Sequence, residues 1–329
     1  MDNKGLISIV ILNWNGQDII EKCIESILNQ TYKNVEFIIV DNGSSDQSYM
    51  QAINYLENRS IEYKTTVFPN NIGFASGMNE GIKHSTGEFC ILLNEDVILE
   101  ETYLQKAIDC FNNNKDVGIV GGKIFKLING EKTTEIDSCG SYLLKRFKTV
   151  KVNDKDKSTL TFGVSGCCPM VRKVTLEAIE LNDGEFYDDD YFAYFEDLDL
   201  YYRCQLIGWK SFYNAEMLAW HVRSASMGGK KRTVDKPDFF QVHVFKNRYL
   251  TMYKNMSLQL FISKLPYLFI TELALFSYMV ILKPKKLKNL LRAYREAFKL
   301  RTKMRLKRKM IQDSVQITHD YINKFYVRY

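Results

Sequence analysis

The chain has 329 residues, of which 46% are hydrophobic and 26% charged, with a net charge of +6. This composition excludes a disordered or fibrous protein, and the length suffices for two domains or for one large α/β domain with an extension. The seven cysteines show no CxxC pair and no metal-finger spacing, which indicates reduced, mostly buried thiols in a cytosolic protein. The polar N-terminus predicts no signal peptide.

The first hundred residues predict alternating strands and helices. Residues 6–12 and 35–40 are continuous apolar runs rich in β-branched side chains, which is typical of strands buried on both faces. Between them, residues 16–30 place their apolar side chains on one helical face. The pattern then predicts a third strand, a helix and a fourth strand, near residues 63–68, 75–84 and 89–93. We therefore predict an α/β fold built on an open, mainly parallel sheet flanked by helices.

Polar residues follow three of these strands directly. They are Asn13-Trp14-Asn15 after the first, Asp41 to Asp46 after the second, and Asn94-Glu95-Asp96 after the fourth. Ligands of open α/β sheets bind at the carboxyl ends of the strands, so we expect these side chains to meet at one edge. A simpler explanation is turn chemistry, with an Asx-type turn at the triplet and a turn cap at Asp41.

Common nucleotide-binding motifs are missing from this edge. The first strand is not followed by GxGxxG, and the chain has no GxxxxGK[ST]. A dinucleotide-binding fold and a P-loop enzyme are therefore disfavoured. A short acidic turn such as Asn94-Glu95-Asp96 instead suits a hard divalent cation, which takes oxygen ligands from one or two carboxylates and from substrate phosphates.

A second acidic group lies among aromatic residues at 191–203. Glu196, Asp197 and Asp199 follow two phenylalanines and precede two tyrosines. A helix start explains one acid through the helix dipole, but it does not explain three. Partly desolvated carboxylates have raised pKa values and suit general-base catalysis. His221 follows another apolar run, although a lone histidine is more often structural than a ligand.

The C-terminal part differs in composition from the rest. The pattern between 99 and 223 is mixed, with a helix expected near 102–112, and the chain reads as helical from residue 238 onward. Residues 265–282 are mainly apolar with one charge, Glu272, and reach the lower limit of a membrane span. Residues 283–309 then hold thirteen Lys and Arg and a single acid. This basic run indicates an anionic partner.

Taken together, these motifs resemble the inverting family 2 glycosyltransferases of the GT-A fold. The resemblance covers about residues 5–226 and is strongest to the rhamnosyltransferase-like branch that builds bacterial cell-surface polysaccharides. The motifs are specific for the family but only weakly specific for the sugar. The processive-synthase motif Gln-x-x-Arg-Trp is missing, which implies the addition of one or a few sugars.

The resemblance implies a role for each polar site. Asp96 falls on the second Asp of the Asp-x-Asp motif, the usual Mg²⁺ or Mn²⁺ ligand, and His221 falls where some members add a metal ligand. Glu196 and Asp197 fall on the Glu-Asp motif, with Asp197 as the general base. Asn94 replaces the first Asp of the metal motif, which would weaken the hold on the metal. Implied contacts to the nucleotide or donor come from Asn13, Asn15, Asp41, Asn71, Gly73, Asn79, Asn94, Glu95 and Asp96.

We therefore expect a glycosyltransferase that uses a nucleotide-diphosphate sugar and a lipid-linked or polysaccharide acceptor. The first candidate donor is dTDP-L-rhamnose, and a UDP-sugar is the alternative. A catalytically weak scaffold subunit is a further alternative, suggested only by Asn94. A sugar-1-phosphate nucleotidyltransferase is disfavoured because its glycine-rich basic loop is absent. No nucleic-acid partner is expected, and an oligomer is left open.

Three regions are predicted along the chain. Residues 1–98 would bind the nucleotide sugar, residues 99–237 would bind the acceptor, and residues 238–329 would form a helical, basic, membrane-associated region. An apolar segment followed by basic residues suits an anionic bilayer surface. We expect a peripheral protein on the cytoplasmic face of the cell membrane. A single span is less favoured, because Pro266 and Glu272 interrupt the apolar segment.

Overall fold

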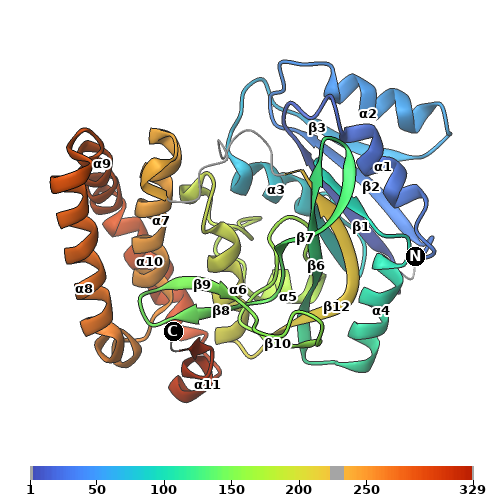
Figure 1. Ribbon diagram of the computed structural model, residues 1–329. Coiled ribbons are helices and arrows are strands. Elements are labelled where there is room, and N and C mark those ends of the chain that lie inside the picture. Colours follow the sequence, from blue (N-terminus) through green and yellow to red (C-terminus); the bar gives the residue numbers. More distant parts are fainter. Residues whose placement is uncertain (1–2, 223–232, 328–329) are drawn as a thin grey trace.

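The N-terminal part of the computed structural model, which describes residues 3–222 and 233–327, alternates strands and helices (Figure 1). In chain order these are β1 (Ile7–Asn13), α1 (Ile20–Leu28), β2 (Val35–Asp41), α2 (Ser48–Glu57), β3 (Tyr63–Val67), α3 (Phe74–Lys83) and β4 (Phe89–Asn94). Strands β4, β1, β2 and β3 are parallel neighbours in that order. The predicted strands and helices of this part are confirmed, and α2 is an addition that the sequence pattern did not predict.

Strand β1 is buried at all seven positions because helices cover both faces of the sheet. Alternate side chains of a strand point to opposite faces. Ile7, Ile9 and Ile11 therefore belong to one core with α1, α2 and α4 (Tyr103–Asn113), while Val10 and Leu12 belong to the other core with α3. The continuous apolar run predicted as a doubly covered strand is explained by this arrangement.

The sheet continues into the second half of the chain. Its order is β10-β12-β6-β11-β4-β1-β2-β3. The long strands β6 and β12 are parallel, and the short β11 lies antiparallel between β4 and β6. The mainly parallel central sheet is confirmed. The elements of this half are β5 (Val97–Leu99), β6 (Val117–Ile128), β7 (Glu131–Ser138), β8 (Ser141–Leu144), β9 (Lys148–Lys151), β10 (Thr159–Thr161), β11 (Met170–Arg172), α5 (Lys173–Ala178), η1 (Asp189–Tyr191), α6 (Glu196–Leu206) and β12 (Lys210–His221).

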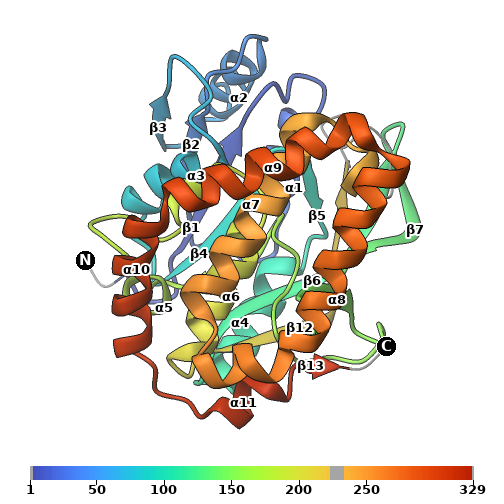
Figure 2. The same cartoon turned by 90° about the vertical axis from the view of Figure 1, so that its left-hand side faces the viewer.

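A layer of C-terminal helices lies beside α6 and forms the face turned to the viewer in Figure 2. Helices α7 and α10 pack against one another, α6 packs against α7, and α8 lies at the outer side of the layer (Figure 1). The prediction of a helical C-terminal region is confirmed, while the three-part division of the chain stays a prediction. The elements are η3 (Thr233–Asp235), α7 (Asp238–Asn255), α8 (Leu258–Leu282), α9 (Pro284–Lys299), α10 (Arg301–Asp313), α11 (His319–Asn323) and β13 (Tyr326–Val327).

The seven cysteines all lie in the described residues, where each is a buried free thiol. Burial raises the pKa of Cys204 to about 12 and that of Cys90 to about 11. Such thiols stay protonated at neutral pH and are poor nucleophiles. The prediction of reduced core cysteines is confirmed.

Candidate active site

The ends of β1 and β2 meet through Asn13 and Asp41, which are opposite one another in the parallel register. The side-chain amide of Asn13 donates to Asp41 Oδ1 at 2.7 Å and to Ser48 Oγ at 2.8 Å. Asp41 Oδ2 accepts from the backbone N–H of Ser44 at 3.0 Å. Asn13 Oδ1 is buried without a hydrogen-bond partner among the described residues. The strand ends thus converge, and an acceptor atom is left over at their meeting point.

Asn15 stabilises the turn beside this pair. It adopts a left-handed conformation with φ of 57°. Its Oδ1 accepts from the Ser45 N–H at 2.8 Å, and its own N–H donates to Ser44 Oγ at 3.0 Å. Asparagine tolerates this conformation better than most residues. The residue therefore supports the loop after β2, in addition to its predicted role at the donor site.

The loop after β3 is held to the same edge by Asn42, which sequence reasoning did not single out. Its amide nitrogen donates to Asn71 Oδ1 at 3.3 Å and to the Gly73 carbonyl at 3.2 Å. Its Oδ1 accepts from the Ile72 N–H at 2.9 Å. Gly73 has a φ of 95°, and a Cβ there would lie 2.8 Å from the Phe192 ring. Only glycine fits at this position.

Asn79 occupies a different kind of position. Its amide nitrogen donates to the Tyr187 carbonyl at 2.8 Å and to Asp189 Oδ1 at 2.9 Å, while its Oδ1 accepts from the Tyr187 N–H at 2.8 Å. Both amide atoms are thus engaged inside the protein. The side chain links α3 to the segment before α6, and its predicted contact with the nucleotide stays a prediction.

The acidic triplet after β4 meets His221 at the end of β12. Strands β5 and β12 are antiparallel, and His221 is opposite Val97 in their register. This pairing brings His221 Nε2 to 3.2 Å from Oδ1 of the buried Asp96. His221 Nδ1 lies 3.1 Å from Oδ2 of Asp137, a buried residue of β7. Two residues that are 125 positions apart in the chain, Asp96 and His221, therefore form one unit.

Burial and neighbouring charges shape the ionisation of this unit. Burial, and then the charge of Asp96, raises the pKa of Glu95 to about 8. Burial opposes the charge of His221, but the sulfur of Cys167 and the carboxylates of Asp137 and Asp96 raise its pKa well above 6.5. Closely spaced carboxylates beside a histidine thus have perturbed pKa values, as is expected of a functional site such as one that binds a cation.

The donor atoms at this tip fit a divalent cation. Asp96 offers a carboxylate, His221 an imidazole, and Asn94 an amide oxygen that is buried without a hydrogen-bond partner in the described chain. Carboxylate and carbonyl oxygens suit Mg²⁺ and Mn²⁺. A carboxylate on the second nitrogen of a histidine, as Asp137 provides here, is the usual support of a metal-bound imidazole.

The second acidic group lies in the first turn of α6. Asp197 Oδ1 accepts from the Leu198 N–H at 2.7 Å, and Glu196 Oε2 is buried without a partner among the described residues. Burial, and then the charge of Asp197, raises the pKa of Glu196 well above its usual range. Burial also raises the pKa of Asp197. The desolvation expected of a general base is therefore present.

The turn at Gly166 and Cys167 contacts Asp197 on one side and the tip of β4 on the other. A Cβ at Gly166 would lie 2.8 Å from Asp197 Oδ2, so the carboxylate packs directly on this glycine. The carbonyl of the next residue, Cys167, accepts from the Asn94 N–H at 2.9 Å. Asp197 and Asn94 thus contact two consecutive residues. The desolvated carboxylate of Asp197 and the tip of β4 therefore lie on either side of the same short turn.

Comparison with known proteins decides the family. Residues 8–179, more than half of the chain, match the model of glycosyl transferase family 2. The chain belongs to this family. An uncharacterized glycosyltransferase of Rickettsia typhi is 30% identical over 197 residues, 58% of each chain. One of Haemophilus influenzae is 27% identical over 133 residues, 40% of each chain. The chain thus spans only about half the length of these curated relatives.

Solved structures share the fold of this family 2 chain. TarS 1–349 of S. aureus in complex with UDP matches with a TM-score of 0.59 and 13% identity, over 94% of this chain and 88% of that one. The mannosyltransferase PcManGT from Pyrobaculum calidifontis in complex with GDP-Man and Mn²⁺ matches with a TM-score of 0.51 and 15% identity, over 96% and 84%. The predicted GT-A fold is confirmed.

Asp199 does not belong with the other two acids of α6. It is fully buried, pairs with Arg203 at 2.9 Å and Lys254 at 3.0 Å, and accepts from Asn255 at 2.7 Å. Burial favours protonation, but Lys254 and Arg203 outweigh it and lower the pKa of Asp199. Asp199 is a structural charge, which narrows the candidate bases of this family 2 chain to Asp197 and Glu196.

A third acidic cluster comprises Glu185, Asp188 and Asp190, whose oxygens lie close enough together to hold a metal. The Lys307 ammonium group occupies the space between them. It bonds to Glu185, to Asp188 at 2.6 Å and to Asp190 at 2.9 Å. Lys254 binds Asp188 from another side. A cation is already supplied by the protein, so we assign no metal to this cluster.

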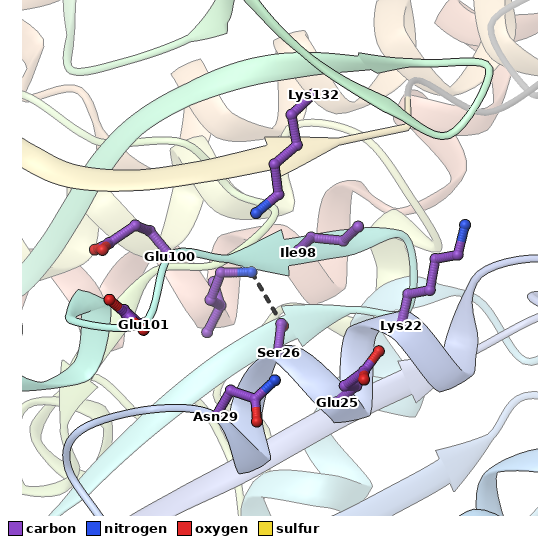
Figure 3. Close-up of a pocket in the computed structure, with 9 residues that line it drawn as sticks. Lys22, Glu25, Ser26, Asn29, Ile98, Glu100, Glu101 and Lys132 are labelled. Atoms are coloured by element: carbon purple, nitrogen blue, oxygen red, sulfur yellow. Dashed lines mark hydrogen bonds between the residues drawn. The ribbon is translucent and has the colours of Figure 1, made fainter.

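An open hollow lies between α1, β5 and β7 (Figure 3), and its lining includes none of the acids of the third cluster. Ser26 Oγ accepts from the Leu99 N–H there at 3.1 Å. The hollow contains none of the residues at the tips of β1, β2 and β4. We assign it no role in the reaction. Its lining consists of Lys22, Glu25, Ser26, Asn29, Ile98, Leu99, Glu100, Glu101 and Lys132.

Sequence reasoning missed two residues of this site. Asn42 lies in the polar run after β2, so its position at a strand end could have revealed it. Asp137 lies in the exposed hairpin strand β7, where no strand-end pattern marks it. Its role depends entirely on the approach of His221, which only the tertiary structure shows.

Proposed function

We propose that this chain is an inverting glycosyltransferase that moves a sugar from a nucleotide-diphosphate donor to an acceptor hydroxyl. The observation that carries the proposal is the shared turn at Gly166 and Cys167, which contacts both Asp197 and the Asn94 tip. Glycosyl transfer needs stabilisation of a departing diphosphate and removal of a proton from the acceptor. The two acidic groups supply one requirement each.

The donor side would act through binding and charge. Asn13 and Asp41 would receive the nucleoside, and Asp96, His221 and the Asn94 amide oxygen would hold Mg²⁺ or Mn²⁺. A divalent cation bound there would stabilise the negative charge of the leaving diphosphate. Asp137 would keep the His221 ring in its orientation.

The acceptor side would act through proton transfer. Asp197 would accept the proton of the acceptor hydroxyl as the new glycosidic bond forms on the face of the sugar opposite to the leaving diphosphate, which inverts the anomeric centre. Its raised pKa brings the carboxylate closer to the working pH, which favours a general base. The pKa of Glu196, beside it, is raised by burial and by the charge of Asp197, which makes Glu196 the second candidate base.

The donor that we propose first is dTDP-L-rhamnose, with a UDP-sugar as the alternative. The solved relatives support a nucleotide-sugar donor in general, because TarS was solved with UDP and PcManGT with GDP-Man and Mn²⁺. The acceptor that we propose is a lipid-linked or polysaccharide hydroxyl in cell-surface glycan synthesis. The inverting mechanism and the rhamnosyl branch rest on the resemblance of the motifs.

The first experiment measures donor hydrolysis and transfer with a panel of dTDP-, UDP- and GDP-sugars, with Mn²⁺, with Mg²⁺ and with EDTA. We expect one nucleotide class to be turned over and EDTA to abolish turnover. Asp96→Ala should weaken binding of the nucleoside diphosphate far more than that of the nucleoside, whereas Asp116→Ala, at the opposite end of the sheet, should change neither. No turnover with any donor, together with equal losses for both ligands, would refute the proposal.

We also propose that α8 attaches the protein to an anionic membrane surface. Within the residues that the structure describes, one helix, α8, is long and apolar enough to cross a membrane. Its two charged side chains are turned inward, because Lys264 donates to Asn323 at 2.5 Å and Glu272 accepts from Tyr249 at 2.7 Å and Tyr294 at 3.0 Å. Large apolar side chains are exposed along the helix and recur every three or four residues: Ile262, Leu265, Phe269, Leu273, Phe276 and Val280.

Exposed basic residues on α9 and α10 would complement the bilayer charge. A continuous stripe of exposed apolar side chains such as that on α8 marks an interaction site. Basic side chains beside the stripe favour an anionic lipid surface over a neutral protein partner. Not all basic residues of the 283–309 run are free to contact a bilayer, however. Lys307 is buried in the acidic cluster, and Lys303 is paired with Asp190. The residues left at the surface include Lys285, Lys288, Arg295, Lys299, Arg301, Arg305 and Lys309.

Flotation with liposomes tests this attachment. We expect the wild type to float with anionic but not neutral vesicles, and high salt to release it. Leu273→Asp on α8 should abolish flotation, whereas Leu160→Asp, an exposed apolar residue of β10, should not. Flotation that ignores both lipid charge and the α8 substitution would refute the proposal. Binding that withstands salt and needs detergent would indicate a true span instead of an in-plane helix.

A further inference from the structure

The segment directly before the proposed general base is strained. Phe192, Tyr194 and Phe195 have φ values of 65°, 72° and 72°, in the left-handed region that bulky side chains avoid. Such a conformation persists only where the surroundings hold it in place. Phe195 immediately precedes Glu196 and Asp197, so whatever holds this segment also sets where the two carboxylates point.

Asn247 of helix α7 holds this segment in its strained conformation. The fully buried side-chain amide of Asn247 donates to three carbonyls of the segment: Tyr191 at 3.0 Å, Ala193 at 2.9 Å and Tyr194 at 2.6 Å. The three carbonyl oxygens converge on this one nitrogen atom and share its two N–H groups. One side chain from α7 therefore satisfies the backbone of the strained turn.

Neighbouring residues of α7 extend this contact along the segment. His243 Nδ1 lies 3.1 Å from the Tyr191 carbonyl, and Lys246 Nζ donates to the Asp190 carbonyl at 2.7 Å. Lys254, about two turns further along the same face of α7, pairs with Asp188 and Asp199, which lie on either side of the strained turn in the chain. From α10, Lys307 adds the bonds to Asp188 and Asp190 described above.

The donor side contacts the same turn from the opposite direction. The Phe192 carbonyl accepts from the Ala75 N–H at the start of α3 at 3.1 Å. The turn is thus held between α3 and α7. The matched family region ends at residue 179, so neither the acids of α6 nor the residues of α7 belong to it.

We propose that Asn247 is a positioning residue for the general base, so that the C-terminal helices complete the active site instead of only attaching the protein to a surface. The proposal rests on the proposed glycosyl transfer. The Asn247 side chain is fully buried and would act through the backbone of residues 191–194. A displacement of about 1 Å of a reacting group can cost about 100-fold in rate.

The test compares Asn247→Leu with Asn289→Leu. Asn289 is a matched control, because it is a buried asparagine of the same helical layer whose amide donates to Gln241 at 3.0 Å and not to the turn. We expect Asn247→Leu to lower kcat about 10- to 100-fold while the Kd of the nucleoside diphosphate, measured by calorimetry, changes less than about threefold. Asn289→Leu should keep kcat within about threefold of the wild type, whatever its effect on Tm.

The outcomes separate the alternatives. Wild-type kcat in folded Asn247→Leu would overturn the proposal, as would equal kcat losses in both variants. If Asn247→Leu does not fold, Lys307→Met is compared in the same way with Lys303→Met, whose exposed lysine lies one turn earlier on α10 and pairs with the same Asp190. A loss of kcat in Lys307→Met but not in Lys303→Met would support the proposal that the C-terminal helices hold the base-bearing turn in place. Equal kcat values in the two variants would refute it. An inactive wild type would instead count against the proposed function.

Discussion

The donor edge and the base-bearing turn are built in different ways. At the donor edge, the parallel register places Asn13 opposite Asp41, and short turns beside the strands complete the arrangement. The base-bearing turn has no ladder to support it. It is held by side chains of α7 and α10, which come 50 to 120 residues later in the chain. One half of the site is therefore specified by the sheet backbone, and the other by distant side chains.

The two regions also differ in how they handle charge. Apart from the His221 contacts, ion pairs of the donor half lie near the surface, such as Lys64 with Glu36, where the lysine side chain is 44% exposed. Around the base-bearing turn, the pairs of Lys254 and Lys307 with Asp188 are buried, and both Lys254 and Asp188 are fully enclosed. Exposed pairs contribute little, whereas a buried pair that loses one partner leaves an uncompensated charge. The base side should therefore be the more fragile half.

The largest effect should come from the base itself. We predict that Asp197→Asn lowers transfer by about 10²- to 10⁴-fold, the usual contribution of general acid–base catalysis. Donor binding should stay intact, because the donor residues belong to the other half. Steady-state kinetics and nucleotide binding by calorimetry check this, with Asp183→Asn, an exposed acid upstream of the turn, as the control. If Asp197→Asn transfers sugar at the wild-type rate, Asp197 is not the general base and Glu196 becomes the candidate.

The next effect concerns stability of the base side. Lys254→Met leaves Asp188 and Asp199 buried with fewer cations, so we predict a loss of about 3–5 kcal/mol in the free energy of unfolding. Lys64→Met, which breaks the exposed pair of the donor half, should cost about 0–1 kcal/mol. Urea unfolding measures both. Similar losses would mean that the two halves do not differ in the way described.

A smaller effect is expected at the metal ligands. We predict that Asp137→Asn weakens Mn²⁺ binding by about 10- to 100-fold, because it removes the carboxylate that orients His221. Calorimetry with Mn²⁺ and nucleoside diphosphate gives the affinity. Asp156→Asn, an exposed acid of a nearby loop, is the comparison and should bind Mn²⁺ normally. Unchanged affinity in Asp137→Asn would leave His221 without a metal role.

The smallest effect tests the donor half through pH. Burial opposes ionisation of Glu36, but bonds from Lys64, Ser8 and Thr86 outweigh it and lower its pKa to about 2. A depressed carboxyl pKa adds stability above the unfolded pKa of 4.5, and this is lost as the pH falls towards 2. Glu36→Gln should cost about 1–2 kcal/mol at pH 7, with the difference disappearing near pH 2. A constant difference at all pH values would contradict this assignment.

Local sequence patterns predicted much of the donor side of the site. Strands that are apolar at every position are recognisable because both faces must be buried, and parallel strands put their carboxyl ends at the same edge. Asn13, Asp41 and Asp96 follow such strands and could therefore be assigned to one site from sequence. The resemblance to family 2 then supplied roles for Glu196, Asp197 and His221.

Only the tertiary structure decided how the distant parts meet. No periodicity relates Asp137 to His221 or Asn247 to Tyr191, because these contacts depend on how β7 and α7 pack and not on spacing along the chain. The same holds for Lys307, which the sequence assigned to a solvent-exposed or lipid-facing basic run and which is buried among three carboxylates. Charge density could be read from the sequence, but the partner of each charge could not. Hydrophobic patterning depends on neighbours in the chain, whereas the pairing of buried polar groups depends on the complete fold.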